Sequence, residues 1–283
     1  MKKLCLSLLL AGLLAGLAAC GGGHGITMQQ VYDANRPAAL LADHESVCVR
    51  FTVDGEDVGV NYVSKEVAYD EAYGWAIFLT DEVAYHCENG TYYRVLPVYK
   101  DGLMDIAEYH KAYESHLLLD PTTARETVES VTEQDGYLTV TTRLPAQYLE
   151  ELGQGLEESW CEYRMEADTY ALLRCENGCR LEDGTSITVA SETVYDEALP
   201  EQAQAFLTLE EGAQLRTVTL VTAPGTQQEK TQSVQVAKGL PVRLDAGMEE
   251  ETMELYTDAA CTQLYTPSDD HDSDITVYLK WSE

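Results

Sequence analysis

The chain has 283 residues, of which 45% are hydrophobic, and its 49 acidic and 18 basic side chains give a formal net charge of -31. The hydrophobic share excludes a disordered tail, and the length allows one large or two ordinary domains with real cores. The acidic excess excludes casual binding to nucleic acid, because few cations are available to replace the counterions of a phosphate backbone. It also disfavours an electrostatic contact with anionic lipid.

The first twenty residues look like a bacterial lipoprotein signal peptide. Lys2 and Lys3 precede an apolar run over 4–17 that is short for a membrane-spanning helix, and the run closes on small residues before Cys20. Residues 1–19 are therefore expected to be removed, and Cys20 is expected to carry the lipid. Residues 20–25 form a glycine-rich tether. This places the protein on the extracytoplasmic face of a bacterial membrane, with the lipid as its attachment.

The next part of the chain predicts a capped helix and then an antiparallel meander. Thr27 and Gln30 have the spacing of a capping box, which opens a helix that Pro37 interrupts and that resumes to residue 42. After it the apolar period changes to two, and Asn89 and Gly90 mark a hairpin turn. The expected strands are 47–53, 58–62, 66–70, 74–79, 82–87 and 91–98.

A helical stripe over 103–117 separates this meander from a second one. His110 lies on the stripe, where a histidine is more often a core residue than a catalytic one. Asp120 and Pro121 have the pattern that starts a second, short helix. A strand is expected at 137–143 and another helix at 145–156.

Two strands on either side of Asp168 form the clearest predicted hairpin. One register places Cys161 opposite Cys175 and, on the other face, Glu162 opposite Arg174. Directly opposed residues bring two cysteines within disulfide range, so this register predicts a Cys161–Cys175 bridge.

Three thiol states stay open for the mature cysteines. They are free thiols, the Cys161–Cys175 disulfide with Cys179 as a competing partner, and a zinc site on these three cysteines, which has no fourth ligand at a telling spacing. The mature chain has six cysteines besides the lipidated one: Cys48, Cys87, Cys161, Cys175, Cys179 and Cys261.

The C-terminal motifs resemble the internalin B type repeat of Listeria and Bacteroides surface proteins. They are VTL at 218–220, VQVAKG at 234–239, YTDAACT at 256–262 and SDITVYLKW at 273–281. The resemblance implies a small β-grasp-like domain over 215–283, after a linker at 209–214. Glu254 and Leu255 stand where the repeat usually has Gly-Trp, so the packing there departs from the family pattern.

Residues 26–208 have a looser resemblance, to bacterial lipoproteins of the LolA-like class. It depends on VYDAN at 31–35, the leucines at 40–41, TVYD at 193–196 and the order of helix, meander, helices and returning meander. The resemblance implies an α+β fold in which a curved antiparallel half-barrel is covered by helices and sometimes holds an acyl chain. It transfers no catalytic residue.

The sequence predicts a non-enzymatic protein with no cofactor and no metal, because it has no nucleophile elbow, phosphate-binding glycine loop, zinc-protease helix or dinucleotide fingerprint. A binding module would hold an apolar or lipid-like ligand between sheet and helix. The alternative is a surface display or adhesion protein with a surface or cell-wall partner and no small ligand. The candidate pocket residues are Val49, Phe51, Val53, Ile106 and Tyr113.

Overall fold

The computed structural model consists mainly of antiparallel strands with a few short helices, which confirms the expected α+β class. It describes residues 25–99, 102–114, 118–119, 121–145, 156–245, 253–266 and 272–281. The chain divides into two compact units. Unit 1 comprises Met1–Lys65 and Tyr113–Ala198, and unit 2 comprises Glu66–Ala112 and Leu199–Glu283.

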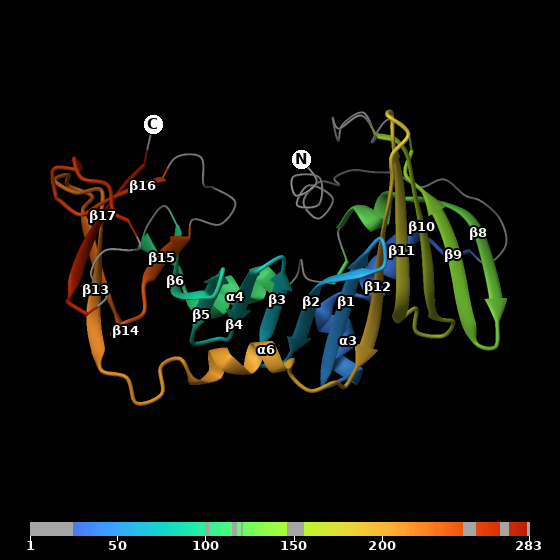
Figure 1. The fold of residues 1–283 in the computed structure, drawn as a ribbon, viewed down its shortest axis with the longest axis horizontal. Coiled ribbons are helices and arrows are strands. Elements are labelled where there is room, and N and C mark those ends of the chain that lie inside the picture. Colours follow the sequence, from blue (N-terminus) through green and yellow to red (C-terminus); the bar gives the residue numbers. More distant parts are fainter. Residues whose placement is uncertain are drawn as a thin grey trace. The chain divides into compact units, whose positions relative to one another are not determined.

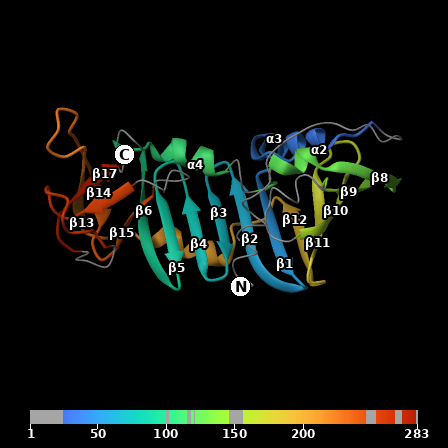
Figure 2. The ribbon, with the colours of Figure 1, turned by 90° about the horizontal axis from the view of Figure 1, so that it is seen from above.

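Unit 1 is a seven-stranded antiparallel sheet with helices on one side (Figures 1 and 2). Its strand order is β2-β1-β12-β11-β10-β9-β8. The elements are α2 (Met28–Ala34), α3 (Pro37–Asp43), β1 (Ser46–Val53), β2 (Glu56–Ser64), the 3-10 helix η1 (Pro121–Arg125), β8 (Thr127–Gln134), β9 (Tyr137–Arg143), β10 (Leu156–Glu166), β11 (Leu172–Leu181) and β12 (Ser186–Tyr195).

Local signals set the beginning of unit 1 as predicted. The Thr27 backbone N–H donates to Gln30 Oε1 at 2.9 Å, and the Gln30 N–H donates to Thr27 Oγ1 at 3.3 Å, so the capping box is confirmed. Pro37 is the first residue of α3, a position that needs no backbone donor. The interrupted helix is therefore two helices. The strand β8 was not predicted, and the helix expected over 145–156 falls mainly on residues outside the described ranges.

The first and last strands of unit 1 pair with each other, which joins the two segments of the unit. Val47 lies opposite Tyr195 and Val53 lies opposite Val189 along an unbroken antiparallel register between β1 and β12. Because these partners are more than a hundred residues apart, their pairing carries a large loop-closure cost that the buried core must offset.

The predicted register of the β10–β11 hairpin is wrong by two residues. Cys161 lies opposite Asn177, Tyr163 lies opposite Cys175, and Met165 lies opposite Leu172. The turn holds one residue more than predicted, and a bulge beside Met165 adds a second. Since a one-residue slip reverses the faces and two slips restore them, both cysteines still point to the same face.

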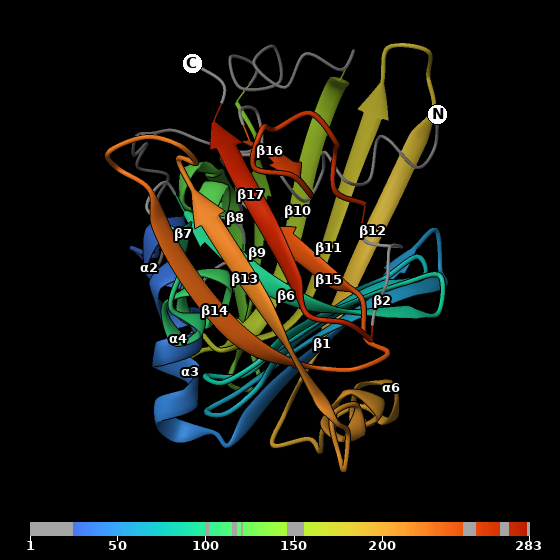
Figure 3. The same ribbon diagram turned by 90° about the vertical axis from the view of Figure 1, so that its left-hand side faces the viewer.

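Unit 2 contains two sheets (Figure 3). The first has the order β15-β6-β5-β4-β3, with β7 paired to β6, and the second has the order β14-β13-β17-β16. The elements are β3 (Ala68–Ala72), β4 (Trp75–Leu79), β5 (Ala84–Glu88), β6 (Thr91–Tyr99), β7 (Gly102–Leu103), α4 (Ile106–Glu114), α6 (Glu201–Gln204), the 3-10 helix η2 (Ala205–Thr208), β13 (Leu215–Thr222), β14 (Lys230–Ala237), β15 (Val242–Asp245), β16 (Met253–Tyr256) and β17 (Ile275–Trp281). The Asn89–Gly90 turn is confirmed, with positive φ at both residues.

The units divide the chain differently from the domains expected at 26–208 and 215–283. β15 pairs in parallel with β6, so that Val242 lies opposite Arg94. Leu96 and Val98 of β6 share one buried core with the C-terminal sheet. The expected linker at 209–214 lies within unit 2, because strand pairing and apolar burial join the segments before and after it.

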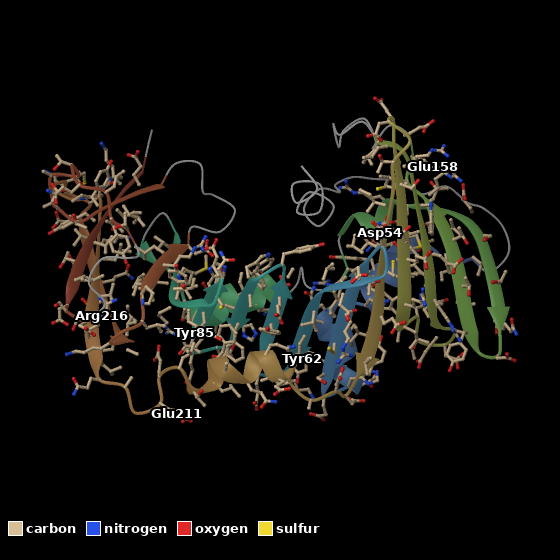
Figure 4. All side chains as sticks on the ribbon, viewed as in Figure 1. Asp54, Tyr62, Tyr85, Glu158, Glu211 and Arg216 are labelled. Carbon is tan, nitrogen blue, oxygen red and sulfur yellow. The ribbon has the colours of Figure 1, made fainter. Side chains whose placement is uncertain are left out.

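The segment just before that linker is anchored by an aromatic side chain. Phe206 of η2 is 3% exposed and stacks on Phe78, with ring centroids 5.3 Å apart. Tyr92 meets it edge-on at 5.1 Å, and Tyr85 of β5, labelled in Figure 4, lies at 6.2 Å. Residues 205–208 are therefore part of the unit 2 core.

Candidate ligand-binding face

The strand registers of unit 1 align a row of side chains across one face of its sheet. Each residue of this row lies opposite the next one on the neighbouring strand. The row is Val140 on β9, Tyr163 on β10, Cys175 on β11, Ser191 on β12 and Phe51 on β1. Val140 is fully buried and Tyr163 is 2% exposed, whereas the other three are half-buried. Burial therefore decreases along the row toward β1.

The helices account for the buried end of this row. Met28 and Val31 of α2 belong to one hydrophobic core with Val140, Tyr163 and Met165. A side chain under α2 is thus removed from water.

A second row, two residues further along each strand on the same face, shows the same decrease in burial toward β1. Thr142 and Cys161 are buried, while Asn177, Val189 and Val53 are half-buried. We call the half-buried members of both rows the β1–β12 patch. It consists of Phe51, Val53, Cys175, Asn177, Val189 and Ser191.

A carboxylate lies at the buried end of these rows. Glu126 follows η1, and both of its side-chain oxygens lie 2.9 Å from Tyr163 Oη. The Thr142 hydroxyl donates to Glu126 Oε2, and the Cys161 thiol donates to Oε1 at 3.5 Å. Burial raises the pKa of Tyr163, so its hydroxyl keeps the proton that it donates. The face thus combines an apolar patch with a hydrogen-bonded polar cluster.

The Cys161 thiol on this face is held in its protonated form. Cys161 and Cys175 are both free thiols in the described chain, which is one of the three states that the sequence left open. Their mutual hydrogen bond and burial raise the pKa of Cys161 well above its usual value. Burial likewise raises the pKa of Cys48 to about 12. Because the thiolate is the reactive form, Cys161 and Cys48 are poor nucleophiles.

The candidate pocket residues fall in different units. Val49, Phe51 and Val53 lie together on one face of β1 in unit 1, with Val49 buried and the other two half-buried. Ile106 lies on α4 in unit 2, and Tyr113 is half-buried at the start of the second segment of unit 1. Cys20 lies outside the described residues.

Sequence reasoning missed Asn177, Val189, Ser191 and Glu126. The period of two in residues 186–194 carried a signal for Val189 and Ser191, because alternate residues of a strand share a face. No signal marked Glu126, whose partners come from two other strands.

Unit 2 has its own polar pairs, and these tie helix α4 and strand β15 to the sheet. Tyr109 of α4 donates to Asp245 Oδ2 of β15 at 2.5 Å. Arg243 of β15 lies 2.8 Å from His86 Nδ1, and burial followed by this cation lowers the pKa of His86. His110 is 4% exposed and its Nδ1 lies 3.0 Å from Asp81, which confirms its place in the core.

Among the described residues, no group of three or more His, Cys, Asp or Glu side chains is arranged to hold a metal ion. No helix in the same ranges is long and apolar enough to span a membrane. In comparisons with known proteins, no protein-family model and no curated protein matches this chain.

Proposed function

We propose that this protein is a non-enzymatic lipoprotein, anchored through Cys20 to the extracytoplasmic face of a bacterial membrane, that binds an apolar or lipid-like ligand on the β1–β12 patch. The observation that carries the proposal is the burial gradient. Phe51, Val53 and Val189 are apolar and only half-buried, although their rows end in fully buried residues. An acyl chain lying on these side chains would remove them from water, and each buried methylene contributes about 0.8 kcal/mol.

The chemistry of the patch suits an amphipathic ligand. Ser191 and Gly59 flank Phe51 in its row, and such small residues leave room beside a large ring. Asn177 offers an amide that can donate to or accept from a polar head group. No charged side chain belongs to the patch, which favours an apolar or weakly polar ligand over a strongly ionic one.

The finer description of unit 1 as a LolA-like half-barrel belongs to this proposal. It is supported by the pairing of the first strand with the last and by helices α2 and α3 on one side of the sheet. A sheet that curls away from its covering helices leaves side chains that a ligand can cover.

A surface-display function is the second candidate, and one observation favours it. In the C-terminal sheet β13 and β17 pair in parallel at the centre, with β14 and β16 antiparallel at the edges. This order supports a β-grasp-like, internalin B type unit, as expected for a surface or cell-wall interaction protein.

Enlarging Phe51 distinguishes the two functions. In residues 24–283, Phe51→Trp should weaken binding of a fluorescent fatty acid at least about tenfold, a change of about 1.4 kcal/mol. Its cost to unfolding should stay below about 1 kcal/mol, because an open position does not resist overpacking. Val194→Trp is the matched control, since Val194 lies on the opposite face of β12 and is 41% exposed. It should change neither property.

Two results together would contradict ligand binding on the β1–β12 patch. If the parent protein binds no fatty acid, and Phe51→Trp costs the roughly 1–3 kcal/mol typical of an overpacked core, the patch is ordinary core. Native mass spectrometry of the parent provides a second readout, because a retained lipid would appear as added mass.

A further inference from the structure

The other face of the unit 1 sheet carries a flat aromatic side chain. Trp160 stands opposite Gly178 on β11 and opposite Arg143 on β9. Its indole lies directly against Gly178, where an added Cβ would come within 2.2 Å of Trp160 Cε2 and 2.5 Å of Nε1. Only glycine allows the ring to lie this close. Trp160 is half-buried, so part of its side chain is exposed to solvent.

Ion pairs lie on the strands beside Trp160. Arg143 pairs with Glu129 at 2.7 Å and also with Glu158, which is labelled on β10 in Figure 4. Arg180 pairs with Glu158 at 3.1 Å and with Glu157 at 2.9 Å. Exposed pairs of this kind contribute little to stability, so their donors and acceptors can exchange partners with a ligand at small cost.

We propose that Trp160, Arg143, Glu158 and Arg180 form a glycan-binding platform. A pyranose ring with equatorial substituents presents an apolar C–H face to an indole and directs its hydroxyl groups outward, to the side. There the guanidinium groups can donate and the carboxylate can accept. Two arginines against three glutamates leave a local excess of one negative charge, which disfavours an anionic ligand. The platform is distinct from the β1–β12 patch, because it lies on the opposite face of the strands.

The probe is chitotriose, the β-1,4-linked trimer of N-acetylglucosamine, titrated into the full-length lipidated protein in a polyoxyethylene detergent. Calorimetry should show binding with a Kd in the range of about 0.1–5 mM, as a single exposed platform would give. Trp160→Leu, which keeps an apolar side chain but removes the aromatic ring, should weaken binding at least tenfold. Trp160→Tyr should retain most of it. Trp75→Leu, a tryptophan of unit 2, is the matched control and should bind as the parent does.

Two further measurements separate a binding role from a structural one. Gly178→Ala should push the indole outward and weaken binding, even in samples whose circular dichroism matches that of the parent. Cellotriose lacks the acetamido groups of chitotriose. It should still bind if Trp160 recognises the C–H face of the sugar ring, and its affinity should be lower if the acetamido groups also contribute.

Three results would overturn the proposal. The first is that neither trisaccharide gives a heat of binding up to about 10 mM. The second is that Trp160→Leu binds with unchanged affinity. The third is that Trp160→Leu lowers the melting temperature while the parent protein binds neither sugar. The last result would mean that Trp160 only covers Gly178 and stabilises the sheet.

Discussion

Truncating Phe206 to Ala is expected to destabilise unit 2 by about 3–5 kcal/mol, the range measured for buried phenylalanines. The structure places this value in the upper half of the range. Phe206 is 3% exposed, and it contacts four aromatic rings with centroids 5.1–6.2 Å away: Phe78, Tyr92, Tyr69 and Tyr85. Each favourable aromatic pair adds about 0.5–1.5 kcal/mol beyond its area.

Equilibrium urea unfolding at constant temperature measures this loss. It should be followed by far-ultraviolet circular dichroism and by the fluorescence of Trp75, which lies in β4 of the same unit. Leu207→Ala is the matched control, because Leu207 is the next residue and is 54% exposed. Its cost should remain within about 0.5 kcal/mol, as for surface substitutions elsewhere.

The comparison tests whether the segment before the expected linker is packed. If residues 199–208 were extended and unpacked, Phe206→Ala would cost less than about 1 kcal/mol and limited proteolysis would cleave there readily. Such a result would refute the packing of Phe206 into unit 2. A large loss confined to Phe206→Ala would support it.

Replacing Cys20 with Ala should move the protein from the membrane to the soluble fraction in detergent partitioning, and an unchanged membrane fraction would contradict lipidation. Asn35→Ala should cost about 1–3 kcal/mol in urea unfolding, because its buried amide bonds three backbone groups at 2.8 Å each, whereas the exposed Gln29→Ala should cost almost nothing. Burial lowers the pKa of His86 from 6.5. The unfolded state therefore binds more protons, and stability should fall as the pH decreases through about 6.5. His86→Gln should lose that part of the pH dependence, and an identical profile would disprove its origin.

The local sequence was sufficient to predict those elements that depend only on residues close in sequence. The capping box at Thr27 and Gln30, the helix interruption at Pro37 and the turn at Asn89–Gly90 all formed as predicted. Each depends on contacts within a few residues, so the local sequence contains the whole interaction.

The β10–β11 hairpin shows where local pattern stops being sufficient. Alternation correctly predicted that Cys161 and Cys175 share a face, because a face depends only on the parity of the register. It did not predict which residues are opposed, since one extra turn residue and one bulge leave that parity unchanged. The expected opposition of Cys161 and Cys175, on which the disulfide alternative depended, was therefore wrong, while the expected face was right.

Only the tertiary structure decided the division into units and the composition of the candidate face. Strand β15 joins β6, Phe206 enters an aromatic core, and Glu126 meets Tyr163, each across at least 37 residues of sequence. Such contacts form only when burial and strand pairing across the whole unit offset the entropy of closing long loops. By itself the sequence determined the acidic net charge, most strands and the α+β class. Which strands become neighbours, and which apolar side chains stay half-exposed, depended on the fold as a whole.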